Sequence, residues 1–378
     1  MREAAATPAP TFPPKLNAFP TTLKARPICG TQVDSSSVQC QASQSLAATP
    51  LPNASATAAQ IPGLQPAQLA QQYGFNPSGG GAGQTVAVVT AFDSSLYLQN
   101  DLNVYRTAFG LGPCTTANGC LTIVNQHPLL AIPDPVGVWP IEADLDVEMV
   151  SAVCPKCKII VAQAEDRHLS SLAATDDLAV ADGATEVSNS WSLPESAAAV
   201  AYGSHFAHPG VPIVAGSGDG GYAVGFPADL ASVIAVGGTT LNIATHQESV
   251  WSLTGSGCSS LIAKPAFQHD SGCANRTTND VSVVGDPTTG VAVYSTTAGG
   301  WVVMGGTSIG APVVASLYAL AANGTSVNDA TSLYAHASAF NAISSGSNGT
   351  CSPAYLCTAT GAYSGPAGLG TPKGIAGF

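Results

Sequence analysis

Residues 158–189 read KIIVAQAEDRHLSSLAATDDLAVADGATEVSN, which predicts a strand, a helix and a second strand in succession. The strands are expected at Lys158–Ala164 and Glu186–Asn189, and the helix at Leu169–Ala181 between them. A helix that connects two consecutive strands is typical of a parallel sheet covered by helices. This stretch therefore indicates an α/β fold.

The same alternation extends in both directions along the chain. It predicts a mainly parallel central sheet flanked by helices. Before the first stretch we expect helices at 65–73, 96–109 and 142–153 and a strand at 85–90; after it we expect a helix at 195–206, strands at 211–215 and 233–236, and a last strong helix that begins at Ser308.

The first 62 residues differ from the rest in composition. They are rich in Pro, Ala, Ser and Thr and lack a clear period, so we interpret them as an extended arm. Residues 63–378 are then expected to form one globular domain.

The chain of 378 residues contains few charged side chains. Charged residues make up 9% of it, against roughly 25% in an average soluble protein. Its 23 acidic and 11 basic residues give a net charge of −12, which would repel nucleic acid and anionic membranes. No apolar run approaches the roughly 18 residues of a membrane span. We therefore expect no nucleic-acid or membrane partner, and few ion pairs to lose in acid.

Ten cysteines fall into five close pairs. An even count in close pairs is typical of local disulfides in an oxidising compartment, so we expect a secreted protein. Free buried thiols in a cytosolic protein are the alternative. One pair, in the sequence CPKC at 154–157, also fits a redox or zinc site, but no second CxxC accompanies it. The expected pairs are Cys29 with Cys40, Cys114 with Cys120, Cys154 with Cys157, Cys258 with Cys273, and Cys351 with Cys357.

The sharpest local motif is GGTSIGAP at residues 305–312. It places Ser308 at the start of an apolar helix, where free backbone N–H groups and the helix dipole favour a developing oxyanion. Ser308 is therefore a candidate nucleophile. The alternative is that Thr307 or Ser308 is only a helix N-cap.

A nucleophilic serine needs a general base, and histidine is the usual one. No histidine here is followed by the Gly-Thr found in subtilisin-like enzymes. A His-dependent hydrolase, with Asp93 orienting the base, stays an alternative that this absence opposes. The histidines are His127, His168, His205, His208, His246, His269 and His336.

A pair of carboxylates is the other candidate base. The stretch IEADLDVEMV at 141–150 puts Glu142 and Asp146 four residues apart, on one face of the expected helix. Two like charges there raise the pKa of one carboxyl, which suits a general acid or base. The alternative is a solvated acidic helix face.

These motifs resemble the sedolisin, or serine-carboxyl peptidase, family in content and order. The resemblance covers roughly residues 63–378. Besides the carboxylate and serine motifs, SGDG at 217–220 with FPA at 226–228 and VGGT at 236–239 is similar to the family segment that carries an oxyanion Asp, and SNSW at 188–191 is similar to its substrate wall.

The resemblance implies a subtilisin-like fold and a secreted, acid-acting endopeptidase that cuts polypeptides through an acyl-enzyme. Ser308 would be the nucleophile and Glu142 its base, Asp146 would orient Glu142, and a protonated Asp219 would donate to the oxyanion. Ser190, Trp191 and Gly225 would contact substrate, with the neutral Gly225 opposing a charged specificity. The protein is expected to act as a monomer.

The chain departs from the family at its calcium site. Ala342 and Ser364 stand where the resemblance implies two Asp ligands. Calcium favours carboxylates, so we predict no cofactor and no tight calcium site, and we expect the Cys351–Cys357 disulfide to order this region instead. The alternative is that calcium, another cation or water occupies the remaining backbone carbonyls. The missing ligands also keep open an inactive peptidase-fold binding protein.

Overall fold

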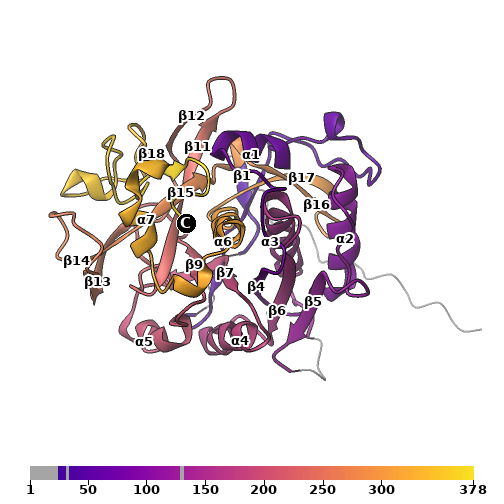
Figure 1. Cartoon of the computed structure of the whole chain (residues 1–378), viewed down its shortest axis with the longest axis horizontal. Coiled ribbons are helices and arrows are strands. Elements are labelled where there is room, and N and C mark those ends of the chain that lie inside the picture. Colours follow the sequence, from indigo (N-terminus) through magenta and orange to yellow (C-terminus); the bar gives the residue numbers. More distant parts are fainter. Residues whose placement is uncertain (1–23, 31–33, 128–131) are drawn as a thin grey trace, which may run out of the picture.

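The central element of the computed structural model is an eight-stranded sheet in the order β12-β11-β9-β7-β4-β6-β5, with β15 also paired to β11 (Figure 1). The structure describes residues 24–30, 34–127 and 132–378. All pairs in this sheet are parallel except β11 with β12. The strands are β4 Thr85–Ala91, β5 Leu121–Asn125, β6 Lys158–Ala164, β7 Glu186–Asn189, β9 Ile213–Gly216, β11 Val233–Asn242, β12 Gln247–Val250 and β15 Val281–Val284.

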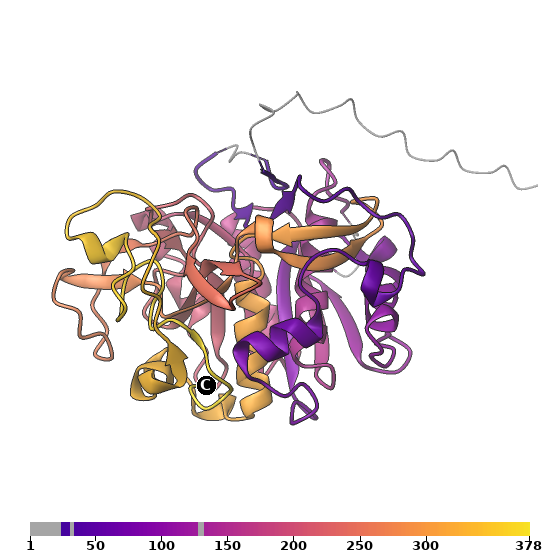
Figure 2. The ribbon, with the colours of Figure 1, turned by 90° about the horizontal axis from the view of Figure 1, so that it is seen from above.

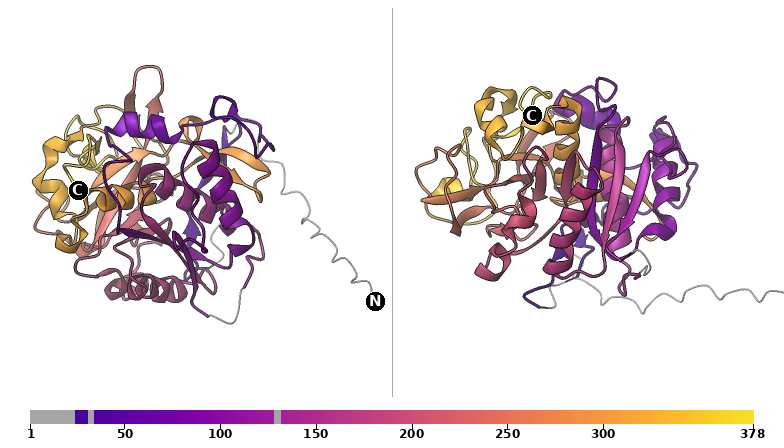
Figure 3. Two further views of the ribbon diagram at one scale, coloured as in Figure 1. Left: turned by 45° about the vertical axis from the view of Figure 1, so that its right-hand side comes forward. Right: turned by 60° about the horizontal axis from the view of Figure 1, so that its bottom comes forward.

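Helices cover both faces of this sheet. In β4, Val86 and Val88 belong to one hydrophobic core, while Ala87 and Val89 belong to a second, as the two-residue period of a strand requires. The first core includes side chains of α1, α2, α3 and α6, and the second those of α4 and α5 (Figures 1 and 3). The helices are α1 Pro66–Tyr73, α2 Ser95–Ala108, α3 Trp139–Val153, α4 Leu169–Ala181, α5 Ala197–Val200, α6 Gly310–Ala321 and α7 Thr331–Ala335.

Short 3₁₀ helices and smaller sheets complete the fold. The 3₁₀ helices are η1 Ala58–Gln60, η2 Gly203–Phe206, η3 Pro287–Thr289, η4 Gly324–Ser326, η5 Ala337–Ala339 and η6 Ala354–Leu356. The remaining strands are β1 Ala25–Pro27, β2 Gln39–Cys40, β3 Ser43–Ser45, β8 Trp191–Pro194, β10 Gly225–Phe226, β13 Gly257–Ala263, β14 Asn275–Thr278, β16 Val291–Ser295, β17 Gly300–Gly305, β18 Phe340–Asn341 and β19 Thr371–Pro372.

Part of the N-terminal arm joins two of these smaller sheets. One has the order β1-β3-β17-β16, and Figure 2 shows its indigo strands beside the orange β16–β17 pair. The other has the order β10-β8-β2. The arm therefore contributes strands to both sheets. Residues 1–23 and 31–33 of the expected arm lie outside the described residues.

The α/β fold with a mainly parallel sheet is confirmed, and β6, α4 and β7 have the expected bounds. Helix α3 begins earlier than expected, at Trp139, because the Asp134 carboxylate accepts from the N–H groups of Val138 and Trp139 at 2.6 and 2.9 Å. Helix α6 begins at Gly310, two residues after Ser308.

The helix expected at 195–206 is wrong in extent. The α-helical part is only α5, and the chain then tightens into η2. Phe206 at the end of η2 is buried, with edge-on ring contacts to Trp191 and Phe226. Tertiary packing thus overrides the helical propensity of this alanine-rich stretch.

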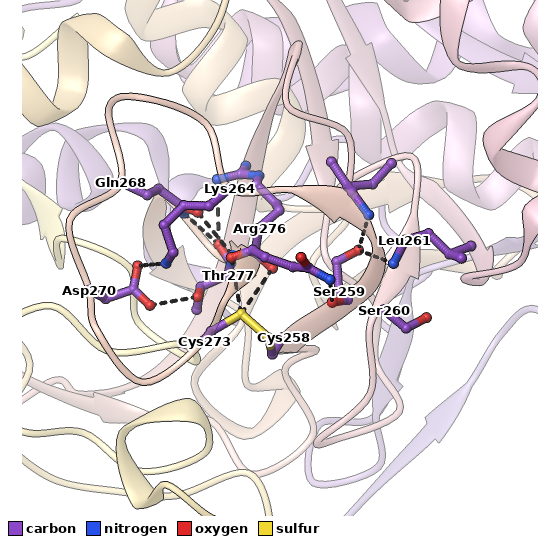
Figure 4. Close-up of a disulfide and its surroundings, with 12 residues drawn as sticks. Cys258, Ser259, Ser260, Leu261, Lys264, Gln268, Asp270, Cys273, Arg276 and Thr277 are labelled. Carbon is purple, nitrogen blue, oxygen red and sulfur yellow. Dashed lines mark hydrogen bonds and ion pairs between the residues drawn. A yellow bond between two sulfur atoms is a disulfide. The ribbon is translucent and has the colours of Figure 1, made fainter.

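All five expected disulfides are present, and no free cysteine remains. Figure 4 shows Cys258 of β13 joined to Cys273, which lies just before β14. Beside this disulfide, Asp270 pairs with Lys264 at 2.7 Å and accepts from Thr277 at 2.9 Å. Among the described residues, no helix has both the length and the apolarity to cross a bilayer.

Candidate active site

Ser308 lies in the turn between β17 and α6. Its hydroxyl donates to the carbonyl of Ser190 at 3.2 Å, and its backbone N–H donates to the carbonyl of Gln41 at 3.0 Å. The turn needs glycine at 306, because φ there is 110° and a Cβ would stand 2.0 Å from the Gln41 oxygen. Neither Thr307 nor Ser308 caps α6, so the N-cap interpretation of this motif is wrong.

Glu142 and Asp146 project from the same face of α3 toward Ser308. Both are buried, with 1% and 0% of their surface exposed, so the solvated-face interpretation is wrong. Asp146 accepts a hydrogen bond from the Ser190 hydroxyl at 2.6 Å. Neither oxygen of Glu142 has a hydrogen-bond partner among the described residues. The Ser308 hydroxyl, which lies near enough to affect the pKa of Glu142, donates to the Ser190 carbonyl instead.

The surroundings raise the pKa of both carboxyls. Burial raises the pKa of Glu142 most, the charge of Asp146 adds to it, and the nearby Ser308 hydroxyl lowers it. Burial also raises the pKa of Asp146, against the hydrogen bond from Ser190. Two interacting buried carboxyls titrate as a unit. Such a pair holds one proton between them over a wide pH range, which leaves the other carboxyl free to act as a base.

Asp219 contacts the residue that directly precedes the nucleophile. Its Oδ1 accepts from the backbone N–H and the hydroxyl of Thr307, at 2.8 and 3.0 Å, whereas its Oδ2 has no partner. The residue is partly exposed as a whole, but Oδ2 is shielded from solvent. Burial raises the pKa of Asp219 to about 7, against the two Thr307 bonds. Below that pH, Oδ2 can carry a proton and donate it.

The three expected substrate-contacting residues lie along or beside β8. Ser190 directly precedes this strand, and its carbonyl accepts from the N–H of Gln41 at 3.0 Å as well as from Ser308. Trp191 is fully buried and pairs in register with Cys40. Gly225 in β10 has little space, since a Cβ there would stand 3.0 Å from the Ser217 carbonyl.

Arm residues at the site are not predicted by any local motif. Gln41 sits against Ser308, Ser190 and Asp219, and the Cys29–Cys40 disulfide lies beside Glu142. The two sulfurs and a Glu142 carboxylate oxygen lie within 4.8 Å of one another. Because those sulfurs are bonded to each other, this cluster is not a metal site. The pairing of the arm with β8 spans about 150 positions of sequence, which local periodicity does not report.

The residues at the implied calcium position do not fit a tight calcium site. Ala342 offers no side-chain oxygen, and Ser364 offers a neutral, buried hydroxyl that has no hydrogen-bond partner among the described residues. The carbonyl of Ile343 already accepts from Gly361 N at 3.0 Å. A hard cation favours anionic oxygens, and this donor set supplies none from Ala342 or Ser364.

The other motifs have structural roles. Cys154 and Cys157 form a disulfide packed on Gly81, where a Cβ would stand 2.1 Å from the Cys154 sulfur. His205 and His208 pair with Asp177, at 2.6 and 3.2 Å, on the α4 side of the sheet. The backbone N–H of Ser95 donates to Asp93 at 2.8 Å.

Comparisons with known proteins agree with this arrangement. No family model matches the chain. It is 29% identical over 351 residues to kumamolisin of Bacillus sp. strain MN-32; the match covers 82% of this chain, and the chain spans 62% of the length of that relative. It is similar to the structure of Pseudomonas sedolisin, a serine-carboxyl proteinase solved with two molecules of pseudo-iodotyrostatin, with a TM-score of 0.71, 23% identity, and coverage of 83% and 96% of the two chains.

A more distant similarity is to fervidolysin from Fervidobacterium pennivorans, a keratinolytic enzyme related to subtilisin. The TM-score is 0.51 at 15% identity, over 82% of this chain and 45% of that one. The subtilisin-like fold expected from the sequence motifs is therefore confirmed. The chain is thus similar in sequence to kumamolisin and shares the fold of Pseudomonas sedolisin.

Proposed function

We propose that the chain is a serine-carboxyl endopeptidase that hydrolyses peptide bonds in acid. The observation that carries this proposal is the convergence of Ser308, Glu142 and Asp219 around one point, where each carboxyl has a raised pKa. The similarity to kumamolisin and to Pseudomonas sedolisin supports a peptidase. The five disulfides support action in an oxidising compartment, outside the cell.

The geometry supports a definite division of roles. Ser308 Oγ attacks the substrate carbonyl and passes its proton to Glu142, while Asp146 holds the one proton that the carboxyl pair already carries. The oxyanion that forms accepts from the Ser308 N–H and from protonated Asp219. The amine leaves with the proton from Glu142, and water then hydrolyses the acyl-enzyme.

This mechanism predicts a bell-shaped pH profile. On the acid side, activity falls as the Glu142–Asp146 pair takes up its second proton and the base is lost. On the alkaline side, activity falls near pH 7 as Asp219, whose pKa burial raises to about 7, ionises and no longer donates.

The test is hydrolysis of denatured casein between pH 3 and 9, with kcat/KM measured for three variants. Ser308→Ala and Glu142→Gln should each lose on the order of 10³-fold or more, and the double variant little further, because the residues act as a unit. Glu148→Gln is the matched control: it lies on the same helix and is equally buried, but it accepts from Tyr294 N at 3.0 Å. Full activity in Glu142→Gln, or an optimum above pH 8, would exclude this mechanism.

A further inference from the structure

The wall strand β8 turns two serine side chains toward the active site. Ser190 lies just before the strand, and its hydroxyl donates to Asp146 at 2.6 Å. Successive side chains of a strand point to opposite faces. Trp191 accordingly lies on the other face, where its ring packs edge-on against Phe206. Ser192 returns to the face of Ser190, so its side chain projects on the side of the catalytic carboxyls.

Two glycines lie against the Ser192 side chain. A Cβ at Gly218, the residue directly before Asp219, would stand 3.3 Å from the Ser192 hydroxyl oxygen. A Cβ at Gly225 in β10 would stand 3.5 Å from the Ser192 Cβ and 3.6 Å from its hydroxyl oxygen. Ser192 therefore takes up the space beside both glycines, between β8 and the segment that carries Asp219.

The arm residue Gln41 shows which part of a peptide enters this space. Its carbonyl accepts from the Ser308 N–H at 3.0 Å, which places it where the residue before a scissile bond would stand. Its side-chain Oε1 accepts from Asp219 N at 2.7 Å. The same oxygen lies 3.9 Å from the position that a Cβ of Gly218 would take. The side chain before the scissile bond is thus directed to the space between Gly218 and Ser192.

The Gln41 side chain bends back on its own strand. Its amide donates to the carbonyl of Gln39 at 2.9 Å, while its Oε1 is held by the backbone of Asp219. An unbranched amide therefore finds its hydrogen bonds without displacing Ser192. An aromatic or branched aliphatic side chain has no such bonds to make and must be buried between β8 and Gly218, where the Ser192 hydroxyl lies. Forcing extra atoms into a packed site is unfavourable.

We propose that Ser192 sets the substrate preference of this site, by limiting the residue before the scissile bond to small side chains and glutamine. This inference rests on the proposed peptidase function and names the class of peptide bond that the site cuts. Polypeptides are cut after Ala, Ser or Gln more readily than after Leu or Phe. The discrimination comes from the shape of the space beside Gly218 and Gly225, which Ser192 narrows.

The experiment measures kcat/KM of the full chain at pH 4 on quenched fluorescent peptides that differ at one residue only. That residue is Ala, Ser, Gln, Leu or Phe, and mass spectrometry confirms that each peptide is cut directly after it. We expect the Ala, Ser and Gln peptides to be cleaved about 10-fold or more faster than the Leu and Phe peptides, a usual size for discrimination by shape. Sequencing of casein fragments should show the same preference.

Two substitutions of Ser192 test its role directly. Ser192→Gly removes the side chain beside the two glycines and should raise kcat/KM for the Leu and Phe peptides by about 10-fold or more, with little change for the Ala peptide. Ser192→Ala removes only the hydroxyl and should lie between the parent and Ser192→Gly. The matched control is Ser249→Gly, which also places a glycine in a strand, but in β12 at the edge of the large sheet. It should cleave the peptides like the parent.

The outcomes are distinct. A parent that prefers Leu or Phe, or a Ser192→Gly variant with the parent's preference, overturns the inference and leaves the peptidase function standing. An equal rise for every peptide in Ser192→Gly also overturns it, because Ser192 would then limit access without selecting side chains. If neither the parent nor any variant cleaves the peptides or casein, the proposed function fails and the inference fails with it.

Discussion

At the scale of single residues, Asp219 connects the chemistry to pH. Its Oδ1 is occupied by Thr307 and its Oδ2 is free, so only the protonated acid can donate to an oxyanion. The amide of Asn can donate at every pH. We therefore expect Asp219→Asn to keep much of its activity in acid and to lose the decline of kcat/KM toward neutral pH.

Asp219→Ala is the comparison for that variant. It lacks any donor and should lose about 10²- to 10³-fold in kcat in acid, where Asp219 of the parent is protonated, the usual cost of removing one oxyanion-hole donor, and the difference from the parent should shrink toward neutral pH. Profiles of kcat/KM from pH 3 to 9 for the parent and both variants decide the matter. A decline toward neutral pH that persists in Asp219→Asn would assign it to another group.

The sequence predicts site residues that belong to a local motif. It does not predict residues that reach the site through contacts between distant parts of the chain. The spacing of Glu142 and Asp146 puts them on one face of a helix, and the structure has them there. Gln41 carries no comparable pattern. Its contacts with Ser190 and Ser308 depend on the pairing of distant strands, which only the folded chain reveals.

At the scale of elements, the loop closed by Cys351 and Cys357 supports the segment that carries Asp219. The backbone carbonyl of Asn348 accepts from Tyr222 N at 3.0 Å, and its side chain donates to Thr254 O at 2.6 Å. Asn348 N in turn donates to the carbonyl of Cys357 at 3.0 Å. The disulfide closes a loop that lies between Ala342 and Ser364, and we expect it to order this region.

This arrangement predicts that the disulfide, and not a cation, stabilises the C-terminal region. Cys351→Ser/Cys357→Ser should lose about 2 kcal/mol, the value expected for a short closed loop. A chelator should leave the melting temperature at pH 4 unchanged. Thermal melts of parent and variant, with and without chelator, provide the measurement. A large chelator effect beside a variant that melts like the parent would contradict it.

Elements with strong local signals have the expected bounds, and the exceptions have tertiary causes. Strand β6 and helix α4 agree with their patterns to the residue, because apolar periodicity and turn residues coincide there. The stretch 195–206 has helical composition but must deliver Phe206 into the core beside Trp191, so it divides into α5 and η2. The division of this stretch into α5 and η2 is determined by tertiary packing, which a local sequence pattern does not indicate.

At the scale of the whole molecule, buried carboxyls make stability depend on pH. Burial raises the pKa of Asp176, Glu186 and Asp229 to about 8 each. Unfolded, these groups ionise near 3.8 or 4.5. Between those values the unfolded chain binds fewer protons than the folded one, so the free energy of unfolding falls as pH rises, by about 1.4 kcal/mol per pH unit for each group.

We therefore expect this stabilisation to be complete below about pH 4 and to be lost as pH rises through about 8. Urea unfolding of Ser308→Ala, which avoids self-cleavage, should give its highest free energy in acid. Asp176→Asn removes one titrating carboxyl and should flatten the slope, since its partner is the amide of Asn189 at 2.8 Å. A free energy of unfolding that climbs from pH 4 to 7 would refute the expectation.

The position of one disulfide determines how the arm is attached to the rest of the molecule. Both Cys29 and Cys40 lie within the arm, and each of the other four disulfides joins cysteines that follow it. The main chain is therefore the only covalent link between the arm and the domain, and it keeps the arm beside Ser308 at an effective concentration on the order of millimolar. A free peptide with the sequence of the arm would have to exceed that concentration in solution to take its place.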